Sequence, residues 1–190
     1  VAHVYDTTYE VVNRGKDTLV VIDDSIVRGT TLEKSILTLL DRLGPKKIVV
    51  VSSAPQIRFP DCYGIDMSRM SDFVAFRAMI ELVKDSGKDY QLGEVYDQCL
   101  RSKGEENYVK KLYEQFTDEE ISAKIAEIVR PASMKAELEV VFQTVENLHK
   151  ACPDHLGDWY FTGNFPTPGG MKVANRAFVN YMEGKLVRAY

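Results

Sequence analysis

The first half of the chain alternates between continuous apolar runs and an amphipathic segment. Residues 18–23 (Thr-Leu-Val-Val-Ile-Asp) and 46–54 are rich in β-branched residues, which is typical of parallel strands buried on both faces. Between them, a predicted helix over residues 30–43 ends at Gly44-Pro45. Its apolar positions recur at helical spacing: Ile36, Leu39, Leu40 and Leu43. This order predicts a strand–helix–strand unit with a right-handed crossover.

The second half has mainly helical periodicity. A helix is predicted over residues 71–85 with Ser71 as its cap, followed by helices over 90–102, 105–116, 118–130 and 135–150. Thr117-Asp118-Glu119-Glu120 has the form of a capping box. A last helix follows the loop 159–170. We therefore expect an α/β core over residues 1–85 and a mostly helical region over residues 86–190 packed on it.

Composition excludes several classes of protein. The chain has 190 residues and a net charge of −4, which does not suit a nucleic-acid-binding surface. No apolar run approaches the length of a membrane span, and the three cysteines are too few and too scattered for a disulfide framework. These features suit the cytoplasm. The chain begins with Val and has no signal-peptide pattern, so we expect a cut or processed fragment.

The candidate chemistry lies where the first strand ends. Asp23 and Asp24 follow the apolar run, and a short loop with Gly29 leads into the next helix. Gly29 lets the backbone turn closely around an anion, and the amides of residues 29–31 would meet a phosphate at the helix N-terminus. Thr30 and Glu33 have capping-box spacing. The alternative is that the paired acids belong to a solvated loop. The segment matches neither the P-loop nor the dinucleotide fingerprint.

The stretch Val20–Thr31 resembles the phosphoribosylpyrophosphate (PRPP) motif of type I phosphoribosyltransferases, and Asp-Asp-Ser-Ile-Val-Arg-Gly-Thr-Thr is similar to the wording found in glutamine PRPP amidotransferases. Three further segments agree: Ser53–Pro60, Tyr63–Met67 and Phe161–Thr167. The resemblance is strong over residues 18–80 and faint over 85–155. It implies a parallel-sheet type I phosphoribosyltransferase fold that is truncated at its N-terminal side and has a mostly helical C-terminal extension.

The resemblance also implies a site. Asp23 and Asp24 would hold the ribose hydroxyls of PRPP and help to place Mg²⁺. Val27, Arg28, Gly29, Thr30 and Thr31 would cradle the 5-phosphate, and Ser25 would also belong to the PRPP-binding residues. The implied reaction is attack of ammonia, derived from glutamine, on PRPP to give phosphoribosylamine in the first committed step of purine synthesis. No protein nucleophile is needed, since positioning and electrostatic stabilisation suffice.

The resemblance carries expectations about partners. Purine nucleotides are candidate inhibitors, and the full-length protein is expected to be a homo-oligomer. The glutaminase domain of the family has no counterpart in this chain, so the chain alone is expected to have little or no transferase activity. No iron–sulfur cluster is expected, because the cysteine ligands of some members would fall near Asp61, Gly157 and Tyr160, none of which is Cys, and Cys62 is one position off.

Several alternatives stay open. The chain resembles other phosphoribosyltransferases in the PRPP motif, and a non-catalytic PRPP or nucleotide-binding regulator would keep the same acids. Arg58 could meet a phosphate or lie on the surface. Cys152 and His155 have the spacing of a metal pair, but a structural role is favoured. The aromatic residues at 159–161 and 165 favour core or interface packing over a ligand box.

Overall fold

The computed structural model describes residues 11–62, 67–155 and 157–189. Part of the matched segment Tyr63–Met67, namely residues 63–66, lies outside these ranges. The fold centres on a three-stranded parallel sheet in the order β1 (Thr18–Asp23), β2 (Lys47–Ser52), β3 (Glu137–Phe142). The prediction of an α/β fold with a parallel sheet is confirmed at this level.

The first strand–helix–strand unit forms as predicted. A single helical segment joins β1 to β2, beginning as a π-helical turn (η1, Leu32–Ile36) and continuing as α1 (Leu37–Asp41). Leu32 and Leu37 are the buried side chains of this segment. The chain then turns at Gly44, whose φ of +74° suits glycine.

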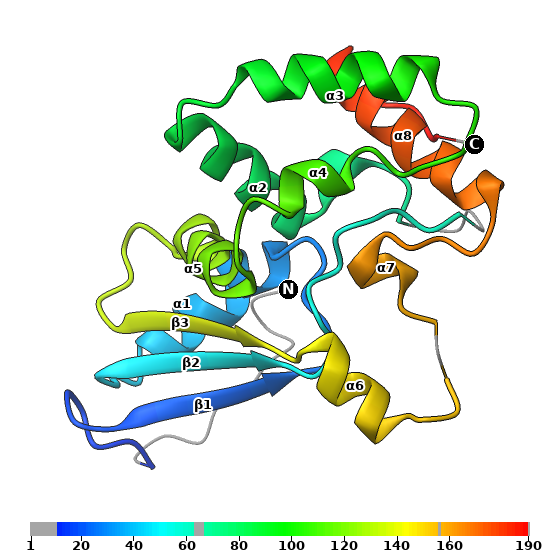
Figure 1. The fold of residues 1–190 in the computed structure, drawn as a ribbon. Helices are drawn as coiled ribbons and strands as arrows, with labels where there is room; N and C mark the ends of the chain where they lie inside the picture. Colours follow the sequence, from blue (N-terminus) through cyan, green and yellow to red (C-terminus); the bar gives the residue numbers. More distant parts are fainter. Residues whose placement is uncertain (1–10, 63–66, 156, 190) are drawn as a thin grey trace.

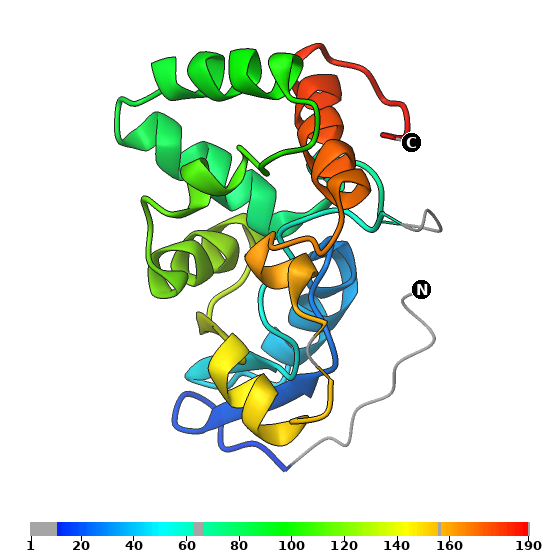
Figure 2. The same ribbon diagram turned by 45° about the vertical axis from the view of Figure 1, so that its right-hand side comes forward.

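Helices cover one face of the sheet in layers (Figure 1). Helix α5 (Asp118–Val129) packs against β3 and against α2 (Val74–Asp85), and α3 (Tyr90–Arg101) packs against α8 (Pro168–Met182). The short 3-10 turn η2 (Met70–Asp72) precedes α2, and α4 (Lys110–Tyr113) follows α3. Figure 2 shows the same succession, in which α3 and α8 lie farther from the sheet than α5.

The predicted helix over 135–150 is wrong in its first half. Residues 137–142 form β3, and only Val145–Ala151 are helical (α6), with the Thr144 hydroxyl accepting a hydrogen bond from the Asn147 amide at 3.1 Å. Leu138, Val141 and Phe142 fit helical spacing, but pairing along the open edge of β2 determined the outcome. The third strand of the sheet therefore comes from the region that was expected to be helical. The division into regions at residue 85 stays a prediction.

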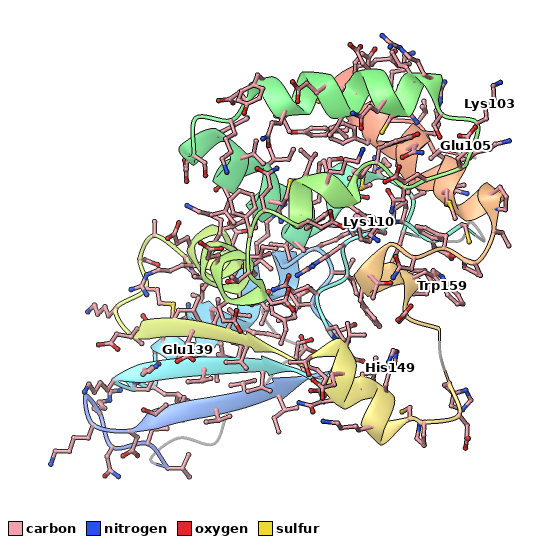
Figure 3. The ribbon with its side chains drawn as sticks, viewed as in Figure 1. Lys103, Glu105, Lys110, Glu139, His149 and Trp159 are labelled. Carbon is pink, nitrogen blue, oxygen red and sulfur yellow. The ribbon has the colours of Figure 1, made fainter. Side chains whose placement is uncertain are left out.

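The expectation that the first strand is buried on both faces is also wrong. Val20 and Ile22 of β1 are 63% and 74% exposed, and no described element packs over them. On that open face the Lys47 ammonium pairs with the Glu139 carboxylate across β2 and β3. Figure 3 shows Glu139 on β3. The core lies on the opposite face, where Ile48 and Val50 are fully buried against the helices.

Other helix boundaries differ in detail. Helix α2 begins after Phe73 and not at Ser71, and its N-cap makes no side-chain hydrogen bond. The predicted helix over 105–116 is reduced to α4, whereas α3, α5 and α8 agree with their predictions. The Thr117–Glu120 capping box is confirmed. Trp159–Thr162 form one short helix, α7, inside the predicted loop. Among the described residues, no helix combines the length and the apolar character needed to cross a membrane.

Candidate phosphate-binding site

The loop after β1 forms a pocket at the carboxyl end of the sheet, where ligands bind in open α/β folds. The cavity has a volume of about 380 Å³, within the range of small-molecule sites. Most of the predicted site residues line it, together with Met67 from the segment that follows β2. Its lining from the predicted site consists of Asp23, Ser25, Val27, Arg28, Gly29, Thr30 and Thr31.

The two acids differ in their positions. Asp23 is half-buried and lines the pocket, whereas Asp24 is exposed and does not. The Asp24 amide donates to Asp23 Oδ1 at 3.0 Å, and the Ser25 hydroxyl donates to Asp24 Oδ1 at 3.3 Å. Both backbone carbonyls are fixed by the chain that leaves β2, since Ser53 N and Ala54 N donate to the Asp23 and Asp24 oxygens at 2.9 and 3.0 Å. The structure thus brings Asp23, but not Asp24, into the pocket wall.

The backbone of the loop is held from behind. The Val74 amide donates to the Val27 carbonyl at 2.8 Å, the Arg77 guanidinium donates to the Arg28 carbonyl at 2.7 Å, and the Glu33 amide donates to the Gly29 carbonyl at 3.0 Å. In a trans peptide the carbonyl and the next amide point in opposite directions. The amides of residues 28–30 therefore point away from these three donors.

The helix start carries no side-chain cap. The Glu33 amide bonds to the Gly29 carbonyl, and Thr31 at the N-cap makes no side-chain bond, so the capping box predicted for Thr30 and Glu33 is wrong. Thr30 and Thr31 are exposed at the pocket. Among the described residues, no backbone carbonyl accepts a hydrogen bond from the amides of residues 29–31. Such amides at a helix start suit an anion.

The side chain of Arg28 lies near an acid. Its guanidinium lies 3.6 Å from the Asp72 carboxylate, which also accepts from Arg69 at 3.0 Å. Arg28 thus borders the pocket while its charge faces Asp72. Sequence reasoning missed both Asp72 and Arg77. No signal near the motif identifies them, since they follow it by more than forty positions.

Arg58 has a structural role. Its guanidinium donates to Gln56 Oε1 at 2.7 Å, pairs with the Asp118 carboxylate, and lies 5.2 Å from the Tyr113 ring centroid. Its side chain is 16% exposed, so neither alternative of the sequence analysis, a phosphate ligand or a surface arginine, describes it. It joins the segment after β2 to the start of α5.

Two of the matched segments contact each other. The amides of Arg58 and Phe59 both donate to the carbonyl of Tyr160, the residue just before the segment Phe161–Thr167, at 2.9 and 3.1 Å. The Phe59 and Phe165 rings meet edge to face at 6.4 Å, and both are buried. Packing is therefore the role of Phe165, as the sequence favoured for the aromatic cluster.

The metal-like pair is not part of a larger cluster. Cys152 and His155 are both exposed, and in the part of the chain that the structure describes no three His, Cys, Asp or Glu side chains could hold a metal together. His149, on α6, has its Nε2 3.4 Å from the Asp158 carboxylate. Figure 3 shows His149 on α6 and Trp159 on α7.

A larger hollow of about 650 Å³ lies elsewhere, between α5 and β3. It is lined by the side chains of the strand and by the carboxylates of Asp118, Glu119 and Glu127. These acidic side chains repel an anion, and the lining does not include a turn like the one between β1 and α1 that lines the smaller pocket. We therefore place the candidate site at the smaller pocket.

Free amides at a helix start, beside an acid at the carboxyl end of a parallel sheet, are a common arrangement in proteins that bind phosphorylated ligands. No family profile matches the chain. Curated relatives are amidophosphoribosyltransferases: that of Pasteurella multocida is 40% identical over 90 residues, covering 47% of this chain and 18% of the relative. That of Escherichia coli is 44% identical over 71 residues, covering 37% and 14%.

The match to the amidophosphoribosyltransferase of Lachancea kluyveri is longer than these two. It has 30% identity over 135 residues, which cover 64% of this chain and 26% of the relative. The chain is thus similar to amidophosphoribosyltransferases, and the resemblance of its motifs is confirmed. It spans about a seventh to a quarter of the length of these relatives.

Proposed function

We propose that this chain carries the PRPP-binding part of an amidophosphoribosyltransferase. The observation that supports this proposal is the loop after β1, whose amides point away from three bonded carbonyls and toward a pocket that also contains Asp23. The amides would bind the 5-phosphate, and the Asp23 carboxylate would accept hydrogen bonds from the ribose hydroxyls. Asp24, exposed beside Asp23, would contribute once ligand is present.

The proposed reaction joins ammonia to the anomeric carbon of PRPP. A C–N bond forms as the C–O bond to pyrophosphate breaks, and pyrophosphate leaves with the electron pair. In this chain Asp23 and the loop would fix the sugar while charge develops on the leaving group. Glutamine would supply the ammonia, and purine synthesis would use the product. These activities are proposed for a longer protein, because the chain spans only part of its relatives.

The carboxylates of this site suit Mg²⁺ when the phosphates of a bound substrate supply further ligands. Two adjacent carboxylates, Asp23 and Asp24, provide hard oxygen ligands, but no third acidic or histidine ligand joins them among the described residues. Mg²⁺ commonly binds through one or two carboxylates, waters and substrate phosphates. When bound, the ion would neutralise charge on the pyrophosphate. Absence of an iron–sulfur cluster, a homo-oligomeric state, nucleotide inhibition and a cytoplasmic location stay predictions.

Calorimetry tests the proposal. PRPP is titrated into the chain with and without Mg²⁺, and Asp23→Asn is compared with Asp97→Asn, an exposed acid on α3. Loss of a charged hydrogen-bond acceptor should weaken binding by about 1–3 kcal/mol, while the control should match the wild type. Unchanged affinity in Asp23→Asn removes that residue from the site. If wild-type chain does not bind PRPP, the proposal for this chain is wrong.

A further inference from the structure

Arg77 lies in the first turns of α2, directly behind the loop that follows β1. Its Nη2 donates to the Arg28 carbonyl at 2.7 Å, and its Nε is buried without a hydrogen-bond partner in the described structure. No carboxylate among the described residues pairs with it, and the nearby Asp72 carboxylate is shared by Arg28 and Arg69. Within the described ranges, therefore, no acid compensates the positive charge of Arg77.

This bond sets the direction of one amide. Because the peptide between Arg28 and Gly29 is trans, a carbonyl held by Arg77 turns the Gly29 amide to the opposite side of the loop, toward the pocket. We propose that Arg77 is a positioning residue: it holds this peptide so that the Gly29 amide faces the ligand phosphate. This inference rests on the proposed function, since it specifies how the same pocket binds its phosphate.

The peptide before Gly29 needs such a restraint. Gly29 has φ +71° and lacks a Cβ, so it is the residue of the loop with the widest choice of backbone conformations. Rotation of the Arg28–Gly29 peptide would exchange its two polar groups and present a carbonyl to the phosphate. A carbonyl oxygen repels an anion where an amide attracts it. The Arg77 bond opposes this rotation, and its charge favours the anion as well.

The experiment uses the whole chain, with ribose 5-phosphate as the probe. Arg77→Met removes the donor and the charge, Arg77→Lys keeps both, and Arg101→Met is the matched control on the exposed end of α3. Calorimetry should show affinity reduced about tenfold in Arg77→Met, equivalent to about 1.4 kcal/mol. The loss should be smaller in Arg77→Lys, and Arg101→Met should be unchanged.

A second readout reports on the amide itself. In the wild type, the ¹⁵N-labelled Gly29 amide proton should shift downfield when ribose 5-phosphate saturates the chain, and in Arg77→Met this shift should shrink. Equal affinity and equal Gly29 shift in wild type and Arg77→Met would overturn the role of Arg77 but leave the proposed function intact. If the wild type binds neither ribose 5-phosphate nor PRPP, the proposed function is wrong and the inference falls with it.

Thermal melting shows whether each variant is folded. If Arg77→Met does not fold, the affinities and Gly29 shifts of the wild type and Arg77→Lys test the inference. A Gly29 amide that does not move while the wild type binds the probe overturns the inference. A second result would also overturn the inference: a smaller Gly29 shift change in Arg77→Lys than in wild type, with equal affinity for ribose 5-phosphate. The orientation of the amide would then not govern binding.

Discussion

Replacing Gly29 with alanine tests whether the loop is held as tightly as its packing indicates. A Cβ built on Gly29 would lie 2.7 Å from the Val129 side chain of α5, well inside van der Waals contact, and 3.5 Å from Val74. The backbone φ of +71° is also unfavourable for any residue with a side chain. Gly29→Ala therefore introduces two separate penalties.

The magnitude follows from adding them. A positive φ costs an alanine about 1–2 kcal/mol, and overpacking by one methyl group costs about 1–3 kcal/mol. We expect Gly29→Ala to lower the free energy of unfolding by about 2–5 kcal/mol. At about 2–4 °C per kcal/mol for a chain of this size, the melting temperature should fall by about 4–20 °C.

A matched control separates the two terms. Gly87 has a similar φ of +66°, but a Cβ there would meet nothing within 4 Å. Gly87→Ala should therefore show only the backbone cost, and the difference between the two variants measures the contact with Val129. Adding Val129→Ala to Gly29→Ala should recover part of that difference beyond the sum of the single changes.

Thermal melting by circular dichroism supplies the numbers. Equal losses in Gly29→Ala and Gly87→Ala would refute the reasoning, because they would mean that the loop yields to the added methyl group at no cost. Such a loop would not have the fixed amide geometry on which the proposed phosphate site depends.

Two further changes probe α5, the helix that supports this loop. Thr117→Ala removes the hydroxyl that accepts from Glu120 N at 3.1 Å and should cost about 1 kcal/mol in denaturant unfolding, whereas Thr117→Ser should cost much less; equal losses would contradict the capping role. Hydrogen bonds that the Lys124 ammonium donates to the Glu127 and Asp85 carboxylates raise the pKa of Lys124 to about 12. Since the folded-state pKa lies above the unfolded value near 10.4, this stabilisation is fully present below about pH 10 and lost as the pH rises through 12. Lys124→Met should flatten that alkaline loss in pH-dependent melting, and an unchanged profile would contradict the assignment.

The part of the fold predicted best was the part determined by local pattern. The β1–helix–β2 unit was predicted from two β-branched runs, an amphipathic segment between them and Gly44 as its end, and all of these appear. Strand β1 and the turn after it lie within one short segment of sequence. The position of the loop over residues 25–31 was therefore predicted as well. Helix α5 was predicted together with its cap, because Thr117 and Glu120 satisfy each other locally.

The errors have a different cause. Residues 137–142 fit a helix by apolar spacing, and what makes them a strand is pairing with residues 47–52, ninety positions earlier. In the same way, Thr30 and Glu33 have the spacing of a capping box, but the Glu33 amide bonds to the Gly29 carbonyl and not to the Thr30 hydroxyl. The spacing of residues along the chain does not show which hydrogen-bond partner a backbone group will find in the folded structure.

The geometry of the candidate site shows this dependence on distant residues most clearly. The motif places the loop, but three donors fix the direction of its amides, and two of them, Val74 and Arg77, lie on α2. Val129, a hundred positions after Gly29, closes the space behind it. Because Val129 lies on α5, which in turn packs on β3, the region after residue 85 is part of what shapes the pocket. A change in α5 should therefore alter phosphate binding without touching the ligand, which a reading of the motif alone does not predict.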